Sequence, residues 1–203
     1  MPRIRAENIE AHKALTRRQI LETAEELFLE QGYTDTSFAD IAAEIGVGRT
    51  TLYEYFGDKE EILVELVRDS LPPLVDGIVD GSPAGLDAGQ RLGELVVRHL
   101  EFICDESNLG TLIMRETPLL SPETQERIRE AHSRLESTLV AIVSEGVADG
   151  QFRPVDPELA GELVNSIVMS TARGLLRSSD PKGRLHDTSD VMLDFLSHGL
   201  GAA

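Results

Sequence analysis

The sequence has a single cysteine, Cys104, no tryptophan and no long apolar run. One cysteine excludes an intramolecular disulfide, so the fold depends on its packed core. A membrane-spanning helix needs about 18 or more consecutive apolar residues, and no stretch approaches that length. The N-terminal residues MPRIRAENIEAHKALTRR lack the apolar segment of a secretory signal. We therefore expect a cytoplasmic globular protein without a membrane partner.

Basic residues are also scarce, since 19 Lys and Arg stand against 36 Asp and Glu, which gives a net charge of −17. A DNA-binding domain usually carries a basic surface that neutralises phosphates. Residues 1–60 hold 7 basic and 12 acidic residues, and only the first 18 residues are basic. Composition therefore gives no indication of a nucleic-acid partner, and that function must be argued from local motifs.

Patterns typical of enzymes are missing as well. The five histidines are His12, His99, His132, His186 and His198. None of them lies in an HExxH motif or at a close metal-ligand spacing. Cys104 follows Ile103 in an apolar segment, which favours a buried thiol over a nucleophile. We expect no enzymatic activity, cofactor or metal site, and the alternative is a helical enzyme or redox sensor that uses Cys104 or a histidine.

Helical periodicity runs through nearly the whole chain, and no segment has the sustained alternation of a strand. The helices that capping residues and glycines delimit lie at about 16–31, 37–45, 48–56, 58–71 or beyond, 90–106, 109–116, 122–149, 157–178 and 189–199. Pro72-Pro73 should kink or shorten the fourth helix. Residues 80–89 and 179–188 are expected to be loops. The predicted fold is all-α, with an N-terminal three-helix domain at 16–57 and a larger helical bundle at 58–203.

The start of the first helix rests on a capping signal. Thr16 followed by Gln19 has the capping-box pattern, which places the helix start there. Residues 1–15 would then form a flexible, solubilising tail. The alternative is an arm that inserts Arg3 and Arg5 into a DNA minor groove.

The segment Ser37–Phe56, SFADIAAEIGVGRTTLYEYF, has the pattern of a helix-turn-helix. Ala42 is small where two helices would cross, and Gly46 permits the positive φ of a tight turn. The apolar seam comprises Ile41, Ile45, Val47 and Leu52. The second helix of the motif carries Arg49, Thr50, Thr51, Tyr53 and Tyr55. These donors suit phosphate oxygens and base edges in a major groove, whereas the alternative is a plain helical corner in a structural adaptor.

Residues 17–66 resemble the DNA-binding region of the TetR family of bacterial regulators. The matching positions are Ala24, Phe28, Gly32, Tyr33, Thr36, Ser37, Asp40, Ile41, Ala42, Gly46, Val47, Thr51, Leu52, Tyr53, Tyr55, Phe56, Lys59 and Glu60. The resemblance implies a helical dimer that binds an operator through the helix-turn-helix and a small molecule through the remaining helices. The sequence departs from the family pattern at Gly48, where a serine cap is frequent, and at Thr50, where a smaller residue is frequent. These two departures leave its base preferences open.

The resemblance also assigns roles to polar residues of this region. The implied DNA contacts are Ser37, Arg49, Thr50, Thr51, Tyr53, Tyr55 and Lys59. Arg49 and Thr50 would contact bases, because they open the recognition helix. Lys59 would bind a phosphate beside the positive end of the fourth helix, and Ser37 would cap the second helix. Tyr33 is expected to pack between helices, with a phosphate contact as the alternative.

The helices after residue 57 would, by the same resemblance, form the dimer interface and an effector pocket. The residues predicted at the dimer interface are Leu163, Ile167, Gly174, Met192, Phe195 and Leu196. The candidate pocket residues are His99, Ile103, Cys104, Met114, Arg115, His132, Leu135, Asn165 and Met169. For each pocket residue, an ordinary core or surface position is the alternative.

The aromatic content narrows the kind of ligand. All three tyrosines lie at 33–55, so the later helices are poorly supplied with side chains for an aromatic cage around a cation. An aliphatic pocket with a few polar anchors suits a lipophilic or acyl-like ligand. The resulting hypothesis is a homodimeric repressor that a small lipophilic effector releases from a palindromic operator.

Overall fold

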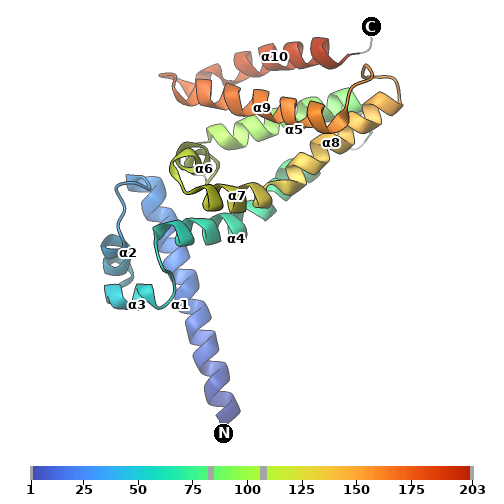
Figure 1. Cartoon of the computed structure of the whole chain (residues 1–203). Coiled ribbons are helices and arrows are strands. Elements are labelled where there is room, and N and C mark those ends of the chain that lie inside the picture. Colours follow the sequence, from blue (N-terminus) through green and yellow to red (C-terminus); the bar gives the residue numbers. More distant parts are fainter. Residues whose placement is uncertain (1, 82–84, 106–108, 202–203) are drawn as a thin grey trace.

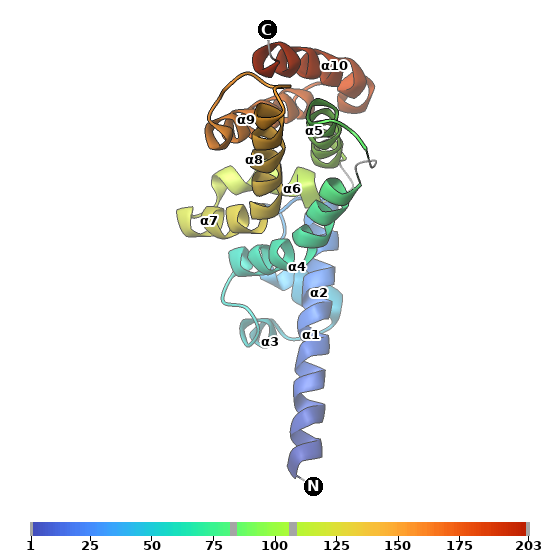
Figure 2. The same cartoon turned by 90° about the vertical axis from the view of Figure 1, so that its right-hand side faces the viewer.

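The computed structural model describes residues 2–81, 85–105 and 109–201, with side chains described from residue 11 onward and not at position 109. Every regular element in these ranges is helical, which confirms the predicted all-α fold. The elements are α1 (Pro2–Gln31), α2 (Phe38–Ile45), α3 (Arg49–Tyr53), α4 (Lys59–Asp80), α5 (Ala88–Cys104), α6 (Leu109–Glu116), the 3₁₀ turn η1 (Thr117–Leu119), α7 (Pro122–Ala131), α8 (Ser133–Ala148), α9 (Pro157–Leu176) and α10 (Pro181–Leu200). Figures 1 and 2 show α2 and α3 beside α1 at one end of the molecule and α10 at the other.

The N-terminal three helices share a small core. Ile20, Ala24 and Phe28 of α1 are buried against Ile41 of α2 and Leu52 of α3. These residues recur at helical spacing, so burying them on one face of each helix fixes the angles between the three helices. The predicted apolar seam is therefore correct for Ile41 and Leu52, while Ile45 and Val47 are partly buried at its edge.

The first helix begins earlier than the capping pattern predicts. The structure runs α1 from Pro2, so the predicted start at Thr16 is wrong, and residues 2–15 continue the helix in place of the expected tail. Thr16 is buried, and its hydroxyl donates to the carbonyl oxygen of His12 one turn back. A threonine can make this bond inside a helix as readily as it caps one, so the pattern alone does not separate the two. In both views α1 projects well beyond the other helices.

The long helix α4 joins the two parts of the chain. It continues to Asp80 through Pro72 and Pro73, so the prolines do not end it. Both prolines lie on the exposed side, while Leu71 and Val75 are buried. Carbonyls that lose an amide partner to proline can be hydrated there, which lowers the cost of the interruption.

Two further boundaries differ from the prediction. The segment 122–149 is divided at His132 into α7 and α8, because His132 has φ −91° and ψ −2° and its N–H bonds back to the end of α7. The expected loop 179–188 is largely helical, since α10 starts at Pro181. Asp180 caps it by accepting from the N–H of Gly183 at 2.9 Å. An Asp-Pro pair followed by glycine is common to loops and helix starts, and here it is a start.

The larger part of the molecule is a bundle in which α5 packs against α8, α9 and α10. Gly161 of α9 lies where α8 approaches closely, since a Cβ there would be 3.0 Å from Cγ2 of Val140. Helices α4, α6 and α7 form a second group, which lies between α9 and the helix-turn-helix. Residues of both groups line one cavity, which is described below.

Candidate functional sites: a DNA-reading helix, an effector cavity and an apolar face

The turn before α3 has the geometry of a helix-turn-helix. Ser37 and Asp40 form a reciprocal capping box, in which the Ser37 N–H and hydroxyl donate to the Asp40 carboxylate at 2.8 and 2.6 Å. These hydrogen bonds lower the pKa of Asp40. Gly46 ends α2 at φ 78°, a left-handed conformation that glycine adopts at little cost. Ser37 is thus a cap, as predicted, and its side chain is exposed.

The exposed side of α3 brings several of the predicted DNA contacts together. Arg49 donates to the hydroxyl of Tyr53 at 3.1 Å, and the half-exposed ring of Tyr53 rests 4.9 Å from that of Phe38. Thr50 is exposed, while Thr51 and Tyr55 are partly covered. Gly48 occupies the N-cap of α3 without a side-chain bond. The helix therefore presents an arginine, a threonine and a tyrosine on one surface, with the tyrosine held by packing.

Lys59 has a different environment from the one predicted. Its ammonium donates to the backbone carbonyls of Thr34 at 3.3 Å and Thr36 at 2.8 Å and also to that of Tyr33. It also lies 4.2 Å from the centre of the Tyr33 ring, a cation–π distance. Partial burial lowers the pKa of Lys59. All three donors of the ammonium thus serve the loop between α1 and α2, and Tyr33 is buried between helices as expected.

A polar joint connects α4 with the helices of the larger part. Glu60, next to Lys59, accepts from the hydroxyl of Thr124 at 2.9 Å and from the N–H of Ser121 at 3.5 Å. The bond from Thr124 is the main reason that the pKa of Glu60 is lowered. Ser121 is the N-cap of α7, so the first turn of α4 holds the first turn of α7. On the other side, Arg17 of α1 forms a 2.8 Å ion pair with Glu65 of α4.

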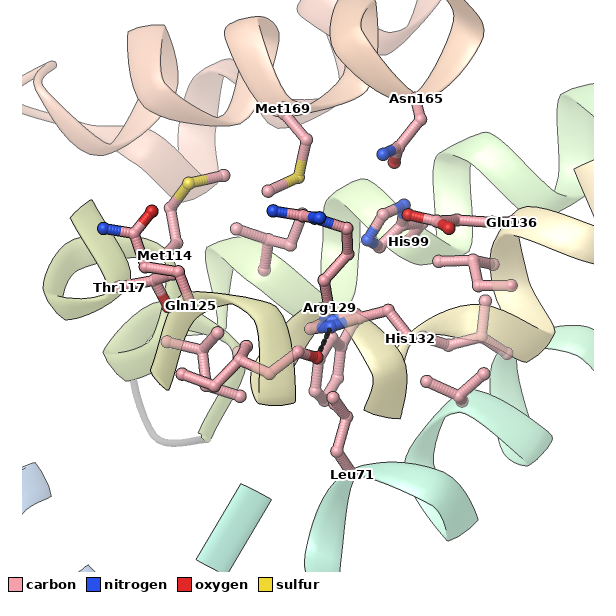
Figure 3. Close-up of a pocket in the computed structure, with 18 of the residues that line it drawn as sticks. Leu71, His99, Met114, Thr117, Gln125, Arg129, His132, Glu136, Asn165 and Met169 are labelled. Atoms are coloured by element: carbon pink, nitrogen blue, oxygen red, sulfur yellow. Dashed lines mark hydrogen bonds between the residues drawn. The ribbon is translucent and has the colours of Figure 1, made fainter. Parts of the chain in front are cut away.

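A cavity of about 320 Å³ lies between α4, α5, α6, α7, α8 and α9. Its lining comprises Leu71, Val75, Ile78, His99, Phe102, Ile103, Gly110, Ile113, Met114, Thr117, Pro118, Gln125, Ile128, Arg129, His132, Leu135, Glu136, Asn165, Met169 and Arg173. The volume is at the lower end of the range that small-molecule sites occupy. Figure 3 shows Met169 and Asn165 entering from α9, opposite Arg129 and Gln125 of α7.

The polar residues of the cavity include two histidines and a threonine whose side chains are partly or wholly buried. Burial, followed by the neighbouring His132, lowers the pKa of His99 to about 4, so this imidazole is neutral near pH 7. Burial also lowers the pKa of His132, whose Nδ1 lies 2.9 Å from the carbonyl oxygen of Ile128. The buried hydroxyl of Thr117 has no hydrogen-bond partner in the described part of the chain. A ligand with oxygen atoms would satisfy such groups.

Most of the predicted pocket residues line this cavity, but Cys104 and Arg115 do not. Cys104 is buried in the core, and burial raises the pKa of its thiol to about 11, so little reactive thiolate forms near pH 7. Arg115 is exposed on the other side of α6 from the cavity-lining Met114. Met114 and Arg115 are adjacent in sequence but point in different directions from α6. Residue type alone does not show which of the two faces the cavity.

Several cavity residues were missed by the sequence analysis: Gln125, Arg129, Glu136 and Arg173. A signal for Arg173 was present, because Asn165, Met169 and Arg173 recur every four residues and share one face of α9. Gln125 and Arg129 have the same spacing on α7. Gln125 and Arg129 reach the cavity because α7 ends at His132 and runs in a different direction from α8. A single helix over 122–149 would not have this bend.

The outer side of α9 and α10 is apolar and exposed. Its large side chains are Leu159, Leu163, Val191 and Phe195, with exposed fractions of 56%, 55%, 71% and 65%. Gly174 is also exposed, and Ile167 is partly buried. Met192 and Leu196, also predicted at the dimer interface, are instead buried in the core of their own chain, which leaves little of them for a second copy. Met192 and Leu196 follow Val191 and Phe195 by one position each, which turns them about 100° around α10, from the exposed side to the core.

Within the described ranges, no helix combines the length and apolar character that crossing a bilayer requires. The same residues contain no cluster of three or more His, Cys, Asp or Glu side chains arranged to hold a metal ion.

Comparison with known proteins identifies both parts of the chain. Residues 20–66 match the family described as bacterial regulatory proteins, tetR family, and residues 85–174 match a tetracyclin repressor-like C-terminal domain. The transcriptional repressor KstR2 of Mycolicibacterium smegmatis is 30% identical over 85% of this chain and 83% of its own. The fatty acid metabolism regulator protein of Bacillus subtilis is 25% identical over 90% of this chain and 94% of its own. The crystal structure of FadR from Bacillus subtilis in complex with stearoyl-CoA superposes with a TM-score of 0.76 at 24% identity, covering 90% of this chain and 98% of that one. This chain is therefore a transcriptional regulator that belongs to the tetR family.

Proposed function

We propose that this regulator is a homodimeric repressor that leaves a palindromic operator when a small lipophilic effector fills the cavity. The observation that carries the proposal is the continuous helix α4. Its first turn holds the helix-turn-helix through Lys59, and its later turns line the cavity with Leu71, Val75 and Ile78. One rigid element thus touches both the DNA-reading part and the ligand site.

DNA reading rests on the exposed face of α3. Arg49 is suited to base edges, because a guanidinium donates two parallel hydrogen bonds to guanine. Tyr53 holds that guanidinium and is itself braced by Phe38. Tyr53, Thr51 and Tyr55 would contact the phosphate backbone, with Thr50 beside Arg49 at the bases. Lys59 acts by holding the loop at 33–36, so it contributes to DNA binding through position and not as a free cation.

Dimerisation rests on the exposed apolar face of α9 and α10. Four large apolar side chains on one surface favour burial against a second copy. A two-fold pairing of α9 and α10 would form a four-helix interface at the end of the molecule far from α3. Two recognition helices are then carried by one rigid assembly, which supplies the affinity of two half-sites.

The effector is proposed to be lipophilic or acyl-like. Just over half of the described residues that line the cavity are apolar, and most of these are aliphatic. Among its relatives, one is named a fatty acid metabolism regulator, and a structural neighbour holds stearoyl-CoA. These names support an acyl ligand for this chain but concern those proteins.

Release would pass through the joint between α4 and α7. An effector that moves α7 would pull on Glu60 through Ser121 and Thr124, and so tilt α4. Tilting α4 in both protomers changes the distance between the recognition helices, so the half-site spacing is lost. The effector must prefer the non-binding state for this to occur, with a coupling of typically ~1–3 kcal/mol.

Selection of binding sites from random DNA tests the proposal directly. We expect a palindromic winner, and a log–log salt dependence with a slope of about −5 to −7 if each protomer makes about three to four phosphate contacts. Decanoate or stearoyl-CoA should then release the protein from that operator. Failure of a folded, dimeric, ligand-free preparation to enrich any site would refute the DNA-binding role, and enrichment without release would refute the effector role.

A further inference from the structure

The charge of the cavity differs in sign from that of the chain. Among the described residues, its lining contains two arginines, Arg129 and Arg173, and one acidic residue, Glu136. In the whole sequence acidic residues outnumber basic ones, 36 to 19. A lining drawn at random from this composition would be acidic, so the basic excess at the cavity favours a negatively charged occupant.

The two arginines come from opposite walls. Arg129 follows Gln125 by one turn on α7, and Arg173 follows Met169 by one turn on α9. Figure 3 shows the guanidinium of Arg129 reaching across the cavity toward Met169. Both arginines are exposed, which places them at the mouth, where an ion keeps part of its hydration. Arg129 also pairs with Glu126, but a solvent-exposed pair of this kind is weak and can be replaced by a ligand.

A cationic ligand has little to bind there. In the described part of the lining, Phe102 is the only aromatic side chain other than the two histidines, so the faces of an aromatic cage are missing there. Burial, and after it the neighbouring His132, already disfavours protonation of His99, as the lowered pKa of His99 shows. Among the described ion pairs, Arg129 is joined to Glu126 and not to Glu136.

The interior offers room for an apolar chain. Leu71, Val75 and Ile78 project from successive turns of α4, and Ile103 and Leu135 close the space from α5 and α8. A chain that extends from the two arginines into this space would pack along the side of α4. Its far end could thus alter the helix that carries the DNA-reading part.

We infer that the cavity binds an amphiphilic anion, with a carboxylate or phosphate group between Arg129 and Arg173 at the mouth and an alkyl chain against α4. This inference deepens the proposed function and rests on the cavity being the effector site. It also fixes the orientation of the ligand, since the reverse arrangement would bury the charge among aliphatic side chains at a prohibitive cost.

A set of ligands with one tail and different head groups tests the inference. We would measure the affinities of decanoate, decyl phosphate, decanoyl-CoA, decanol and decyltrimethylammonium by calorimetry, without DNA. The anions should bind at least about tenfold more tightly than decanol, as charge-assisted hydrogen bonds imply, and the cation more weakly than decanol. Decanoyl-CoA separates a coenzyme A ester from a free acid or phosphate. Equal or tighter binding of the cation, or no binding by any anion, would overturn the inference.

Methionine methyl signals report where the ligand binds. Met114 and Met169 line the cavity, whereas Met192 is buried in the core outside it. In a protein labelled at the methionine methyl carbon, decanoate should shift the Met114 and Met169 resonances and leave that of Met192 in place. Shifts at none of these methyls, despite binding by calorimetry, would mean adsorption elsewhere on the protein and would overturn the site.

Matched variants test the head-group contacts. Arg129→Gln and Arg173→Gln should each weaken decanoate about tenfold and change decanol by less than about twofold. Arg127→Gln is the control, because Arg127 is an exposed arginine on α7 that does not line the cavity. Losses no greater than in this control would overturn the assignment. An intact anion site in a protein that decanoate does not release from DNA would instead refute the proposed function alone.

Discussion

The two regions that α4 connects, the helix-turn-helix and the cavity, differ in how far their polar side chains are hydrogen-bonded. Around the helix-turn-helix, polar groups bind one another: Ser37 with Asp40, and Lys59 with three backbone carbonyls. Around the cavity, Thr117 lacks a partner in the described part of the chain and His99 is buried and neutral. A satisfied network holds one shape, whereas unsatisfied groups gain most from a ligand. The comparison suggests a rigid reading unit moved by an adaptable binding unit.

The largest expected effect on DNA binding comes from the exposed apolar face of α9 and α10, because operator binding by two half-sites requires the dimer. Leu163→Asp with Phe195→Asp should convert the dimer to a monomer and weaken operator binding by about a hundredfold or more. Analytical ultracentrifugation and DNA titration measure the two quantities. Leu119→Asp is the control, since Leu119 is 74% exposed but lies on η1. A dimer that survives the double change would place the interface elsewhere.

The next effect concerns the pH dependence of the cavity. Because the folded-state pKa of His99 is about 4, below its usual 6.5, the unfolded chain binds a proton more readily between these values. Stability that is fully present above pH 6.5 is therefore lost as pH falls toward 4, by up to about 3 kcal/mol. Denaturant titrations across this range should show a steeper loss for the wild type than for His99→Gln. Parallel curves would contradict a buried neutral imidazole.

Loss of the Lys59 ammonium should lower the free energy of unfolding as well as the affinity for DNA. Lys59→Met leaves the carbonyls of the 33–36 loop without their ammonium, which should lower the free energy of unfolding by about 2 kcal/mol. Lys182→Met is the matched control, because Lys182 is largely exposed. If Lys59→Met weakened DNA binding and left stability unchanged, Lys59 would be a phosphate contact as the sequence predicts.

The exposed face of α3 should contain residues that contact bases and residues that contact phosphates. Arg49→Ala should relax the preference at one base pair, at a cost of about 2 kcal/mol for the preferred base. Tyr53→Phe should weaken all sequences together, with a smaller loss of specificity because Tyr53 also holds Arg49. Site selection repeated with each variant measures this difference. Uniform loss for Arg49→Ala would contradict its role at the bases.

The smallest expected effect comes from a change at the polar joint between α4 and α7. Thr124→Val removes the hydrogen bond to Glu60 and should reduce the release of DNA by decanoate by about fivefold, or ~1 kcal/mol. DNA affinity without ligand should change little. Thr138→Val is the control, because that hydroxyl bonds only to the carbonyl of Arg134 in its own helix. Equal release in the two variants would exclude the Glu60 route.

The sequence predicted most of the fold but fewer of the contacts, for reasons that particular residues show. Glycines and caps such as Gly46 and Ser37 act locally, so they could be interpreted correctly from sequence. Thr16 and the Asp180-Pro181 pair are ambiguous locally, since each pattern suits two structures. The break at His132 has no glycine or proline to mark it.

Where each site residue lies depends on packing between segments that are far apart in the sequence. Met192 and Leu196 were grouped with the dimer interface because apolar periodicity does not show which face of α10 meets its own chain. Arg129 reaches the cavity only because α7 turns at His132. Lys59 can reach either DNA or the carbonyls of a loop twenty-three or more residues earlier, and its place in the sequence does not show the second partner. Packing across distant segments sets these assignments.

The most direct test of a ligand-responsive operator-binding regulator is the affinity of decanoate for the free dimer and for the dimer bound to its selected operator. By linkage, a ligand that releases DNA must bind the operator complex more weakly. We predict a difference of about tenfold, with tighter binding to the free protein. Equal affinities would show that filling the cavity has no effect on operator binding, and would contradict the account.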